Sequence, residues 1–215
     1  MNENEKVKLV IDPGHGGSDP GAVNAQSGIH EADVTLRIAH ALKAIFDTHP
    51  EFEVSLTRDG DETVSLRART DLANELDVPF VSIHCNAAPS AGASGVETWC
   101  FADTDPDGSE SAGHRLARAI HKEVAALGMN DRGVKAIYDR NERRYIFRKL
   151  WVLRKTRRAA VILECGFISN AEDAARLGPA CRDARGAGRD DHNGFKERVA
   201  VALFTGIRDA LLAHQ

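Results

Sequence analysis

The sequence predicts an α/β fold: a single domain built on a twisted, mostly parallel sheet of about six strands, with helices on both faces. Two observations lead to this prediction. Short, β-branched apolar runs recur along the chain, and most of them are followed by a segment with helical periodicity. At 215 residues the chain is also long enough to bury a core without disulfide staples, and it shows no internal repeat or linker.

Five strands are expected from apolar or alternating runs. Residues 52–57 alternate between apolar and polar side chains, whereas residues 159–163 are wholly apolar, as in a strand that is buried on both faces. The predicted strands cover residues 7–11, 52–57, 80–83, 95–101 and 159–163.

Five helices are expected between and after these strands. The first carries Val34, Ile38 and Leu42 on one face, and the third repeats this spacing with Leu116 and Ile120. The predicted helices cover residues 31–47, 65–74, 111–127, 170–177 and 192–213.

Several segments do not fit this alternation, among them the loops expected at residues 87–94 and 102–110. Segment 139–158 carries nine basic residues with aromatic side chains between them. That composition is typical of a solvated amphipathic helix or hairpin, and the alternative is a wall of a groove that binds a polymer. Residues 1–6 are expected to form a polar tail, and residues 180–191, rich in Arg, Gly and Asp, a mobile loop.

Composition and terminal sequence exclude several classes of protein. The net charge of −4 argues against bulk electrostatic binding to nucleic acid. No apolar run approaches the roughly 18 residues of a membrane-spanning helix, and the N-terminus lacks the basic and apolar regions of a signal peptide. Because the cysteines have no close ligand spacing, free and mostly buried thiols are expected. They are Cys85, Cys100, Cys165 and Cys181.

Polar side chains follow three of the apolar strands. The segment Asp12-Pro-Gly-His-Gly-Gly17 comes directly after the first strand, and its Pro and Gly residues force a tight turn around His15. His84 ends the third predicted strand and Glu164 the last. Ligands of open α/β sheets bind beyond the carboxyl ends of the strands, so these side chains are expected to converge. A nucleotide site is disfavoured, because the turn has neither a GxGxxG pattern nor a Walker lysine.

Glu31, at the start of the first helix, adds a third metal-binding group. Alone, it is equally well explained by the dipole of the helix. With His15 and His84, it completes the three protein ligands of a catalytic zinc site, which leaves one position for water. Glu164 would be costly to bury unless it is paired or used, and beside such a water it fits a general base and then a general acid. This set fits hydrolysis of an amide or ester, although the same three ligands also form the facial triad of Fe(II) oxygenases.

Taken together, the motifs resemble those of the zinc-dependent N-acetylmuramoyl-L-alanine amidases of bacteria and their phages, the amidase type 3 family. The resemblance rests on residues 10–22, 30–36, 56–59, 65–69, 73–74, 81–87, 95–97 and 161–170. It implies Zn²⁺ on His15, Glu31 and His84, with Glu164 as the catalytic carboxylate. Asn86, two residues after His84, is a further candidate, for contact with the substrate. In the implied reaction, zinc-activated water cleaves the amide between N-acetylmuramic acid and the L-alanine of the peptidoglycan stem peptide.

Two other functions stay open on the residues alone: a non-catalytic peptidoglycan-binding module and a different zinc peptidase. The expected organisation is one catalytic domain over residues 1–215, without a separate wall-binding domain. Only residues 102–110 separate the fourth strand from the next helix, which leaves no room for the inhibitory helix of some relatives. Activity without an activator is therefore expected. The protein is also expected to be a monomer.

The expected place of action is the cell wall, although no export signal is visible in the sequence. Three routes to the wall would fit: release of a phage endolysin, a mother-cell lysin or autolysin, and a secreted protein that lacks its signal.

Overall fold

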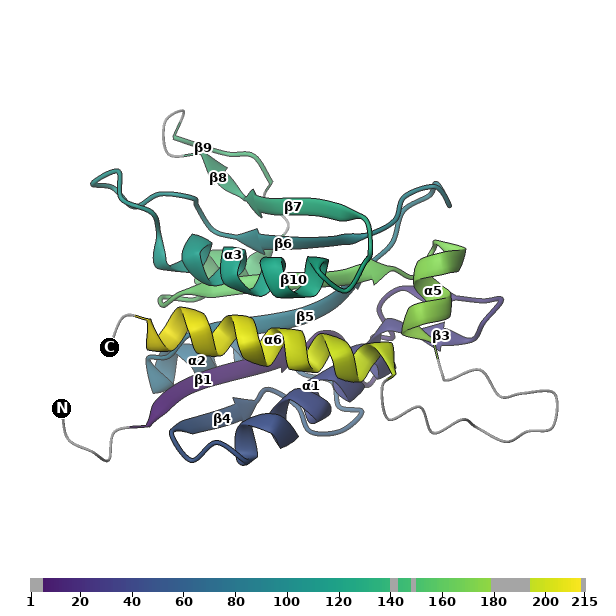
Figure 1. Ribbon diagram of the computed structural model, residues 1–215, viewed down its shortest axis with the longest axis horizontal. Helices are drawn as coiled ribbons and strands as arrows, with labels where there is room; N and C mark the ends of the chain where they lie inside the picture. Colours follow the sequence, from purple (N-terminus) through teal and green to yellow (C-terminus); the bar gives the residue numbers. More distant parts are fainter. Residues whose placement is uncertain (1–5, 140–142, 148–149, 179–193, 214–215) are drawn as a thin grey trace.

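A six-stranded sheet runs through the centre of the computed structural model, which describes residues 6–139, 143–147, 150–178 and 194–213 (Figure 1). In their order across the sheet, the strands are β4 (Phe52–Leu56), β1 (Val7–Pro13), β5 (Phe80–Asn86), β10 (Ala160–Phe167), β6 (Val96–Cys100) and β7 (Asp131–Ala136). The first four are parallel, whereas β6 runs antiparallel to β10, and β7 runs parallel to β6. The predicted α/β fold with a mostly parallel sheet is confirmed.

Helices cover both faces of this sheet, as the sequence predicts. The face seen in Figure 1 carries α1 (Glu31–Asp47), α3 (Ala112–Ala125) and α6 (Phe195–Leu212). The opposite face carries α2 (Leu66–Leu76) and α4 (Trp151–Lys155), which contact β1 and β10. A short helix, α5 (Ala171–Leu177), follows β10 and packs against it.

The alternation of side chains along the strands divides the core in two. Leu9 and Ile11 of β1 pack in the cluster beneath α1, α3 and α6, whereas Val10 packs in the cluster beneath α2 and α4. Phe80 of β5 and Ile162 of β10 also belong to this second cluster. Because side chains repeat every two residues along a strand, the polar groups that follow them on these two strands lie on the same face.

Two strands run further than the sequence indicates. β5 continues to Asn86 and β10 to Phe167, so His84 and Glu164 lie within strands and do not end them, contrary to the prediction. Their backbones continue the ladder, because Glu164 is paired with His84 on one side and with Glu97 on the other.

The strand β7 is missing from the sequence-based prediction. Its six residues, Asp-Arg-Gly-Val-Lys-Ala, contain one β-branched side chain and a glycine. β7 lies at the edge of the sheet, where a strand pairs on one side only and needs no continuous apolar run.

The basic segment 139–158 contains both of the structures considered for it. In its described part, β8 (Tyr138–Asp139) and β9 (Arg144–Tyr145) form a hairpin, and the helix α4 follows. A second small ribbon, of β2 (Val23–Asn24) and β3 (Ile29–His30), leads into α1.

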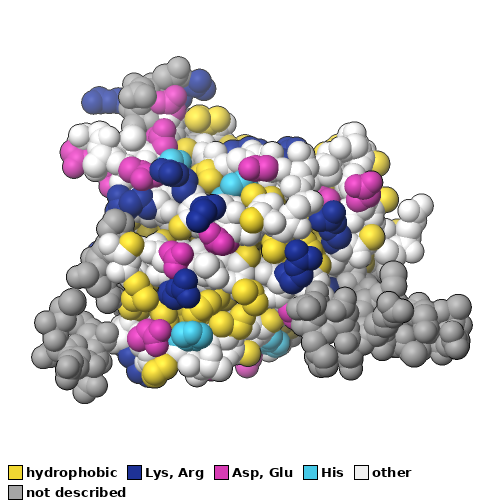
Figure 2. Space-filling model, viewed as in Figure 1, with side chains coloured by type: hydrophobic (Ala, Val, Ile, Leu, Met, Phe, Trp, Pro, Cys, Tyr) yellow, Lys and Arg dark blue, Asp and Glu magenta, His cyan; other side chains and the backbone are white. Residues whose placement is uncertain are grey.

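The remaining predictions concern the cysteines, the polar tail and loop, and the absence of a membrane-spanning helix. Cys85, Cys100 and Cys165 are buried free thiols, as predicted. Cys181, most of the predicted tail 1–6 and the predicted loop 180–191 lie outside the described residues. Among the described residues no helix is long and apolar enough to cross a membrane. On the face shown in Figure 2, acidic and basic side chains are interspersed.

Candidate active site

The structure brings together the three residues that the sequence nominates as metal ligands. His15 lies in the turn after β1, Glu31 is the first residue of α1, and His84 lies in β5. One ligand atom from each residue lies within 4.8 Å of the other two. Glu31 Oε1 is 3.1 Å from His15 Nε2 and 3.0 Å from His84 Nδ1. Two imidazole nitrogens and a carboxylate oxygen form a donor set that suits a divalent transition metal.

The turn that carries His15 is fastened by two buried arginines. Arg69 donates to the Asp12 carboxylate at 2.6 Å and to the carbonyl oxygen of His15 at 2.7 Å. Arg58 donates to the carbonyl oxygens of the turn and to that of Ala32 in α1 at 2.8 Å. The turn is thereby tied to the start of α1, so His15 and Glu31 are held in one rigid unit. Both arginines lie in motifs quoted above, but their role is not readable from spacing alone.

Outer hydrogen bonds orient the candidate ligands. His15 Nδ1 lies 2.8 Å from Asp19 Oδ2, which leaves Nε2 of the ring directed at Glu31. Glu31 Oε2 accepts a hydrogen bond from the backbone of Ala22 at 2.8 Å, and its Oε1 accepts one from Cys85. Carboxylate partners of this kind fix the tautomer and orientation of ligating histidines. Sequence reasoning missed Asp19, whose only signal is its place in the loop after the glycine-rich turn.

The charges of this cluster are strongly coupled. Burial lowers the pKa of His15, but hydrogen bonds and charge from Glu31 and Asp19 outweigh it and raise the pKa to about 9. Burial raises the pKa of Glu31, yet the two histidines hold it well below its usual range. For His84 burial again lowers the pKa, and Glu31 raises it by more. Metal ligation needs neutral imidazoles, so filling this site releases protons.

Glu164 lies beside this cluster on the neighbouring strand. It is directly opposite His84 in the register of β10 and β5. Its Oε2 is buried and has no hydrogen-bond partner among the described residues. Burial raises the pKa of Glu164 to about 7, which suits a group that both takes up and gives back a proton near neutral pH.

Asn86 lies two residues beyond His84, and its side chain is engaged inside the protein. Its Nδ2 donates to Glu97 Oε1 at 2.9 Å, and its Oδ1 accepts from the backbone of Ala87. Contact with a substrate stays a prediction for this residue.

A cavity of about 370 Å³ opens beside the candidate ligands. One wall is the glycine-rich turn with His15 and His84, and the other includes Leu66 at the start of α2 and residues 150–152 at the start of α4. Trp151, which is 38% exposed, therefore brings the basic and aromatic segment to the edge of the site.

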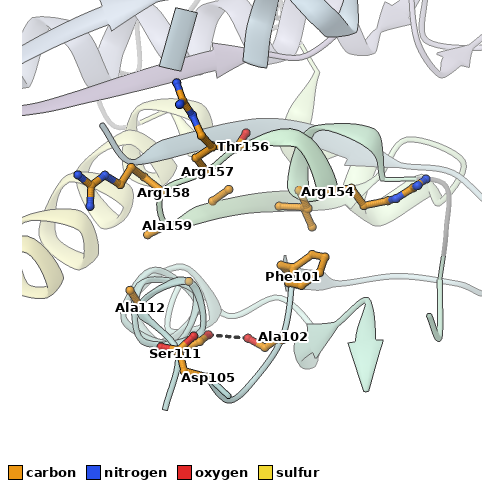
Figure 3. A pocket seen from close by; sticks show the side chains of 13 residues that line it. Phe101, Ala102, Asp105, Ser111, Ala112, Arg154, Thr156, Arg157, Arg158 and Ala159 are labelled. Carbon is orange, nitrogen blue, oxygen red and sulfur yellow. Dashed lines mark hydrogen bonds between the residues drawn. The ribbon is translucent and has the colours of Figure 1, made fainter. Parts of the chain in front are cut away.

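A second cavity, of about 310 Å³, lies at the amino end of β10 and is lined by three arginines (Figure 3). Arg154, Arg157 and Arg158 point in different directions there (Figure 3). Arg158 pairs with Asp77, and Arg157 donates to the carbonyl oxygen of Asn74. The arginines do not converge, and this cavity is separate from the candidate site.

Comparison with known sequences identifies a family. The family described as N-acetylmuramoyl-L-alanine amidase matches residues 9–183. An endolysin of Bacillus phage SPP1 is 40% identical over 174 residues, which are 79% of this chain and 58% of that protein. A sporulation-specific N-acetylmuramoyl-L-alanine amidase of Bacillus subtilis is 37% identical over 80% of this chain and 60% of its own length. The chain thus spans about 58–60% of the length of these relatives.

Solved structures agree with the sequence comparison. The catalytic domain of CwlV, an N-acetylmuramoyl-L-alanine amidase from Bacillus (Paenibacillus) polymyxa, superposes with a TM-score of 0.76 at 32% identity, over 95% of this chain and 98% of that one. The amidase AmiC2 of Nostoc punctiforme superposes with a TM-score of 0.76 at 28% identity, over 97% of this chain and 99% of that one.

Proposed function

Because the chain belongs to the N-acetylmuramoyl-L-alanine amidase family, we propose that it hydrolyses peptidoglycan at the amide between N-acetylmuramic acid and the L-alanine of the stem peptide. The observation that carries the proposal is the convergence of His15, Glu31 and His84 beside Glu164. A binding module would have no use for a buried carboxyl group of raised pKa next to a metal donor set.

His15, Glu31 and His84 would hold a zinc ion. The fit rests on their chemistry: two imidazoles and one carboxylate, gathered within 4.8 Å, match the three-ligand sets of catalytic zinc sites. When bound, zinc supplies Lewis acidity, which makes a water nucleophilic near neutral pH and stabilises negative charge on the carbonyl oxygen.

Glu164 supplies the proton transfers. Its carboxylate accepts a proton from the attacking water as the bond between water oxygen and carbonyl carbon forms. The same group then donates that proton to the L-alanine nitrogen as the C–N bond breaks, so the products are a free lactyl carboxyl group and a free amine. With its pKa raised to about 7, the carboxyl group can both take up and release a proton near neutral pH, as these two steps require.

One feature of the chain and the names of its relatives support action on a polymer in the cell wall. Trp151 and Leu66 form an exposed apolar edge of the cavity beside the ligands. The relatives include a protein named endolysin and one named probable cell wall amidase. Residues 101–111, between β6 and α3, contain no helix that could block the site, so we propose that the protein is active without an activator.

The experiment uses purified peptidoglycan, and the protein is assayed after chelation and after zinc is restored. The new chain ends are then identified. The proposal expects free N-terminal L-alanine without new reducing sugar, lost on chelation and recovered with zinc. A new amine on another stem residue would instead make the protein a zinc peptidase. Tight binding to the wall without release would make it a binding module.

A further inference from the structure

A buried carboxylate on the neighbouring strand holds two cations near Glu164. Glu97, only 4% exposed, is directly opposite Glu164 in the pairing of β6 and β10. Its Oε2 accepts hydrogen bonds from Arg132 Nε at 2.7 Å and from the ammonium group of Lys135. Its Oε1 accepts from Asn86. One carboxylate thus binds two cationic side chains, so the three side chains of Glu97, Arg132 and Lys135 together carry a net positive charge.

A bulge in β7 places both cations on the catalytic face of the sheet. Between the pairs Val96–Asp131 and Thr98–Val134, β7 carries one extra residue, and Gly133 has a φ of 78°. Arg132 and Lys135 would face opposite sides of a regular strand, but here both reach Glu97. Bulges of this kind re-aim side chains beside active sites.

The two cations are fixed in place and still accessible. The guanidinium of Arg132 lies over the Phe167 ring at 4.8 Å, and the ammonium of Lys135 over the Trp99 ring at 5.1 Å. Each side chain remains 32% exposed. The Nε of Arg132 binds Glu97, so the outer nitrogens of its guanidinium are positioned to donate to another anion.

We propose that Arg132 and Lys135 form a subsite for a carboxylate of the stem peptide. This inference rests on the proposed function. Glu164 would protonate the leaving nitrogen, so the peptide leaves on the side of Glu164 that faces away from His84, and β6 and β7 lie on that side. An anionic peptide group then meets a charge-assisted donor pair.

The distances agree with this placement. β7 lies two strand spacings, about 10 Å, from β10. The side chains of Arg132 and Lys135 extend from β7 to Glu97 on β6, which is one strand spacing closer to Glu164. Two peptide residues span roughly 7 Å. A carboxylate on the stem residue that follows L-alanine therefore falls within reach of both cations.

The test compares two synthetic muramoyl peptides, in which the residue after L-alanine carries either a free carboxylate or the matching carboxamide. The zinc-loaded wild type is expected to prefer the acid by about tenfold or more in kcat/KM, as one charge-assisted hydrogen bond allows. Arg132→Gln and Lys135→Gln should each reduce this preference, mainly through KM on the acid. The matched controls Arg118→Gln and Lys8→Gln, on surface ion pairs elsewhere, should leave it unchanged.

Each outcome has a definite meaning. Equal kcat/KM on the two peptides for the wild type would overturn the subsite while leaving the amidase intact, and this result does not depend on any variant folding. A preference that survives unchanged in both folded variants would also overturn it. If the wild type cleaved neither peptide, nor peptidoglycan, the proposed function itself would fail.

Discussion

The imidazole of His84 packs directly against the backbone of Gly14. A Cβ atom added at Gly14 would overlap the ring of His84. Gly14 directly follows β1, which is far from β5 in the sequence but next to it in the sheet. The turn after β1 and the strand β5 are therefore in contact at the candidate metal site, where the backbone N–H of Gly14 also donates to the carbonyl oxygen of Ile83 at 2.9 Å. This contact leads to the first prediction.

Gly14→Ala should displace the His84 ring and weaken metal binding while leaving the fold in place. The backbone of Gly14 does not have a positive φ, so the loss would come from the collision and not from backbone strain. Zinc affinity by competition with a chelator is the measurement. Gly92→Ala is the matched control, because Gly92 does not have a positive φ and an added Cβ there would meet only ordinary contacts. Wild-type affinity in Gly14→Ala would contradict the claim that this contact positions the His84 ring for the metal.

Removing either histidine should remove the zinc. His15→Ala and His84→Ala are each expected to retain far less than one zinc ion per chain after dialysis, measured by elemental analysis, because loss of one of three ligands leaves the site incomplete. His40→Ala is the matched control, since His40 is 46% exposed and pairs with Asp59 on the surface, away from the candidate ligands. Full zinc content in both site variants would place the metal elsewhere.

Arg69→Met should destabilise the whole domain. Arg69 and Asp12 are 4% and 1% exposed, so the substitution leaves a buried carboxylate without its cation, a change that costs about 3–5 kcal/mol. Urea unfolding gives the free energy of unfolding. Arg67→Met removes an exposed pair with Asp71 on the same helix and should cost less than about 1 kcal/mol. A similar small loss in both variants would contradict the anchoring role of Arg69.

Glu97 should contribute to stability in a way that depends on pH. Burial raises the pKa of Glu97, but hydrogen bonds from Lys135, Arg132 and Trp99 outweigh it, so the pKa lies below the usual 4.5. A lowered pKa in the folded state means that the stabilisation is present above pH 4.5 and is lost as the pH falls through the folded-state value. Glu97→Gln should therefore flatten the acid side of the stability curve, as measured by urea unfolding at several pH values. Curves of the same shape for both proteins would be the contrary result.

Much of the site can be predicted from the sequence, because it follows from a general rule. His15, His84 and Glu164 come at the ends of apolar runs, and the carboxyl ends of parallel strands meet at one edge of a sheet. The structure brings all three together near the carboxyl ends of β1, β5 and β10, with Glu31 beside them, although His84 and Glu164 still lie within their strands. Their chemical roles stay predictions.

The parts that sequence reasoning missed depend on contacts that leave no local pattern. β7 is a polar edge strand, so its pairing with β6 is not visible in its own residues. The roles of Arg58 and Asp19 depend on backbone groups far away in sequence or on the orientation of a ring. The cations of β7 share a face with Glu164 only because of a bulge, which one glycine in a sequence does not establish.

The most direct test of the account is Glu164→Gln, which keeps the shape of the side chain and removes its basicity. Zinc content and turnover on purified peptidoglycan should be measured on the same preparation. We expect a full zinc complement and a rate lower by about 10²–10⁴-fold, the usual contribution of general acid–base catalysis. Near-normal turnover at full zinc content would contradict the assignment of Glu164 and the mechanism built on it.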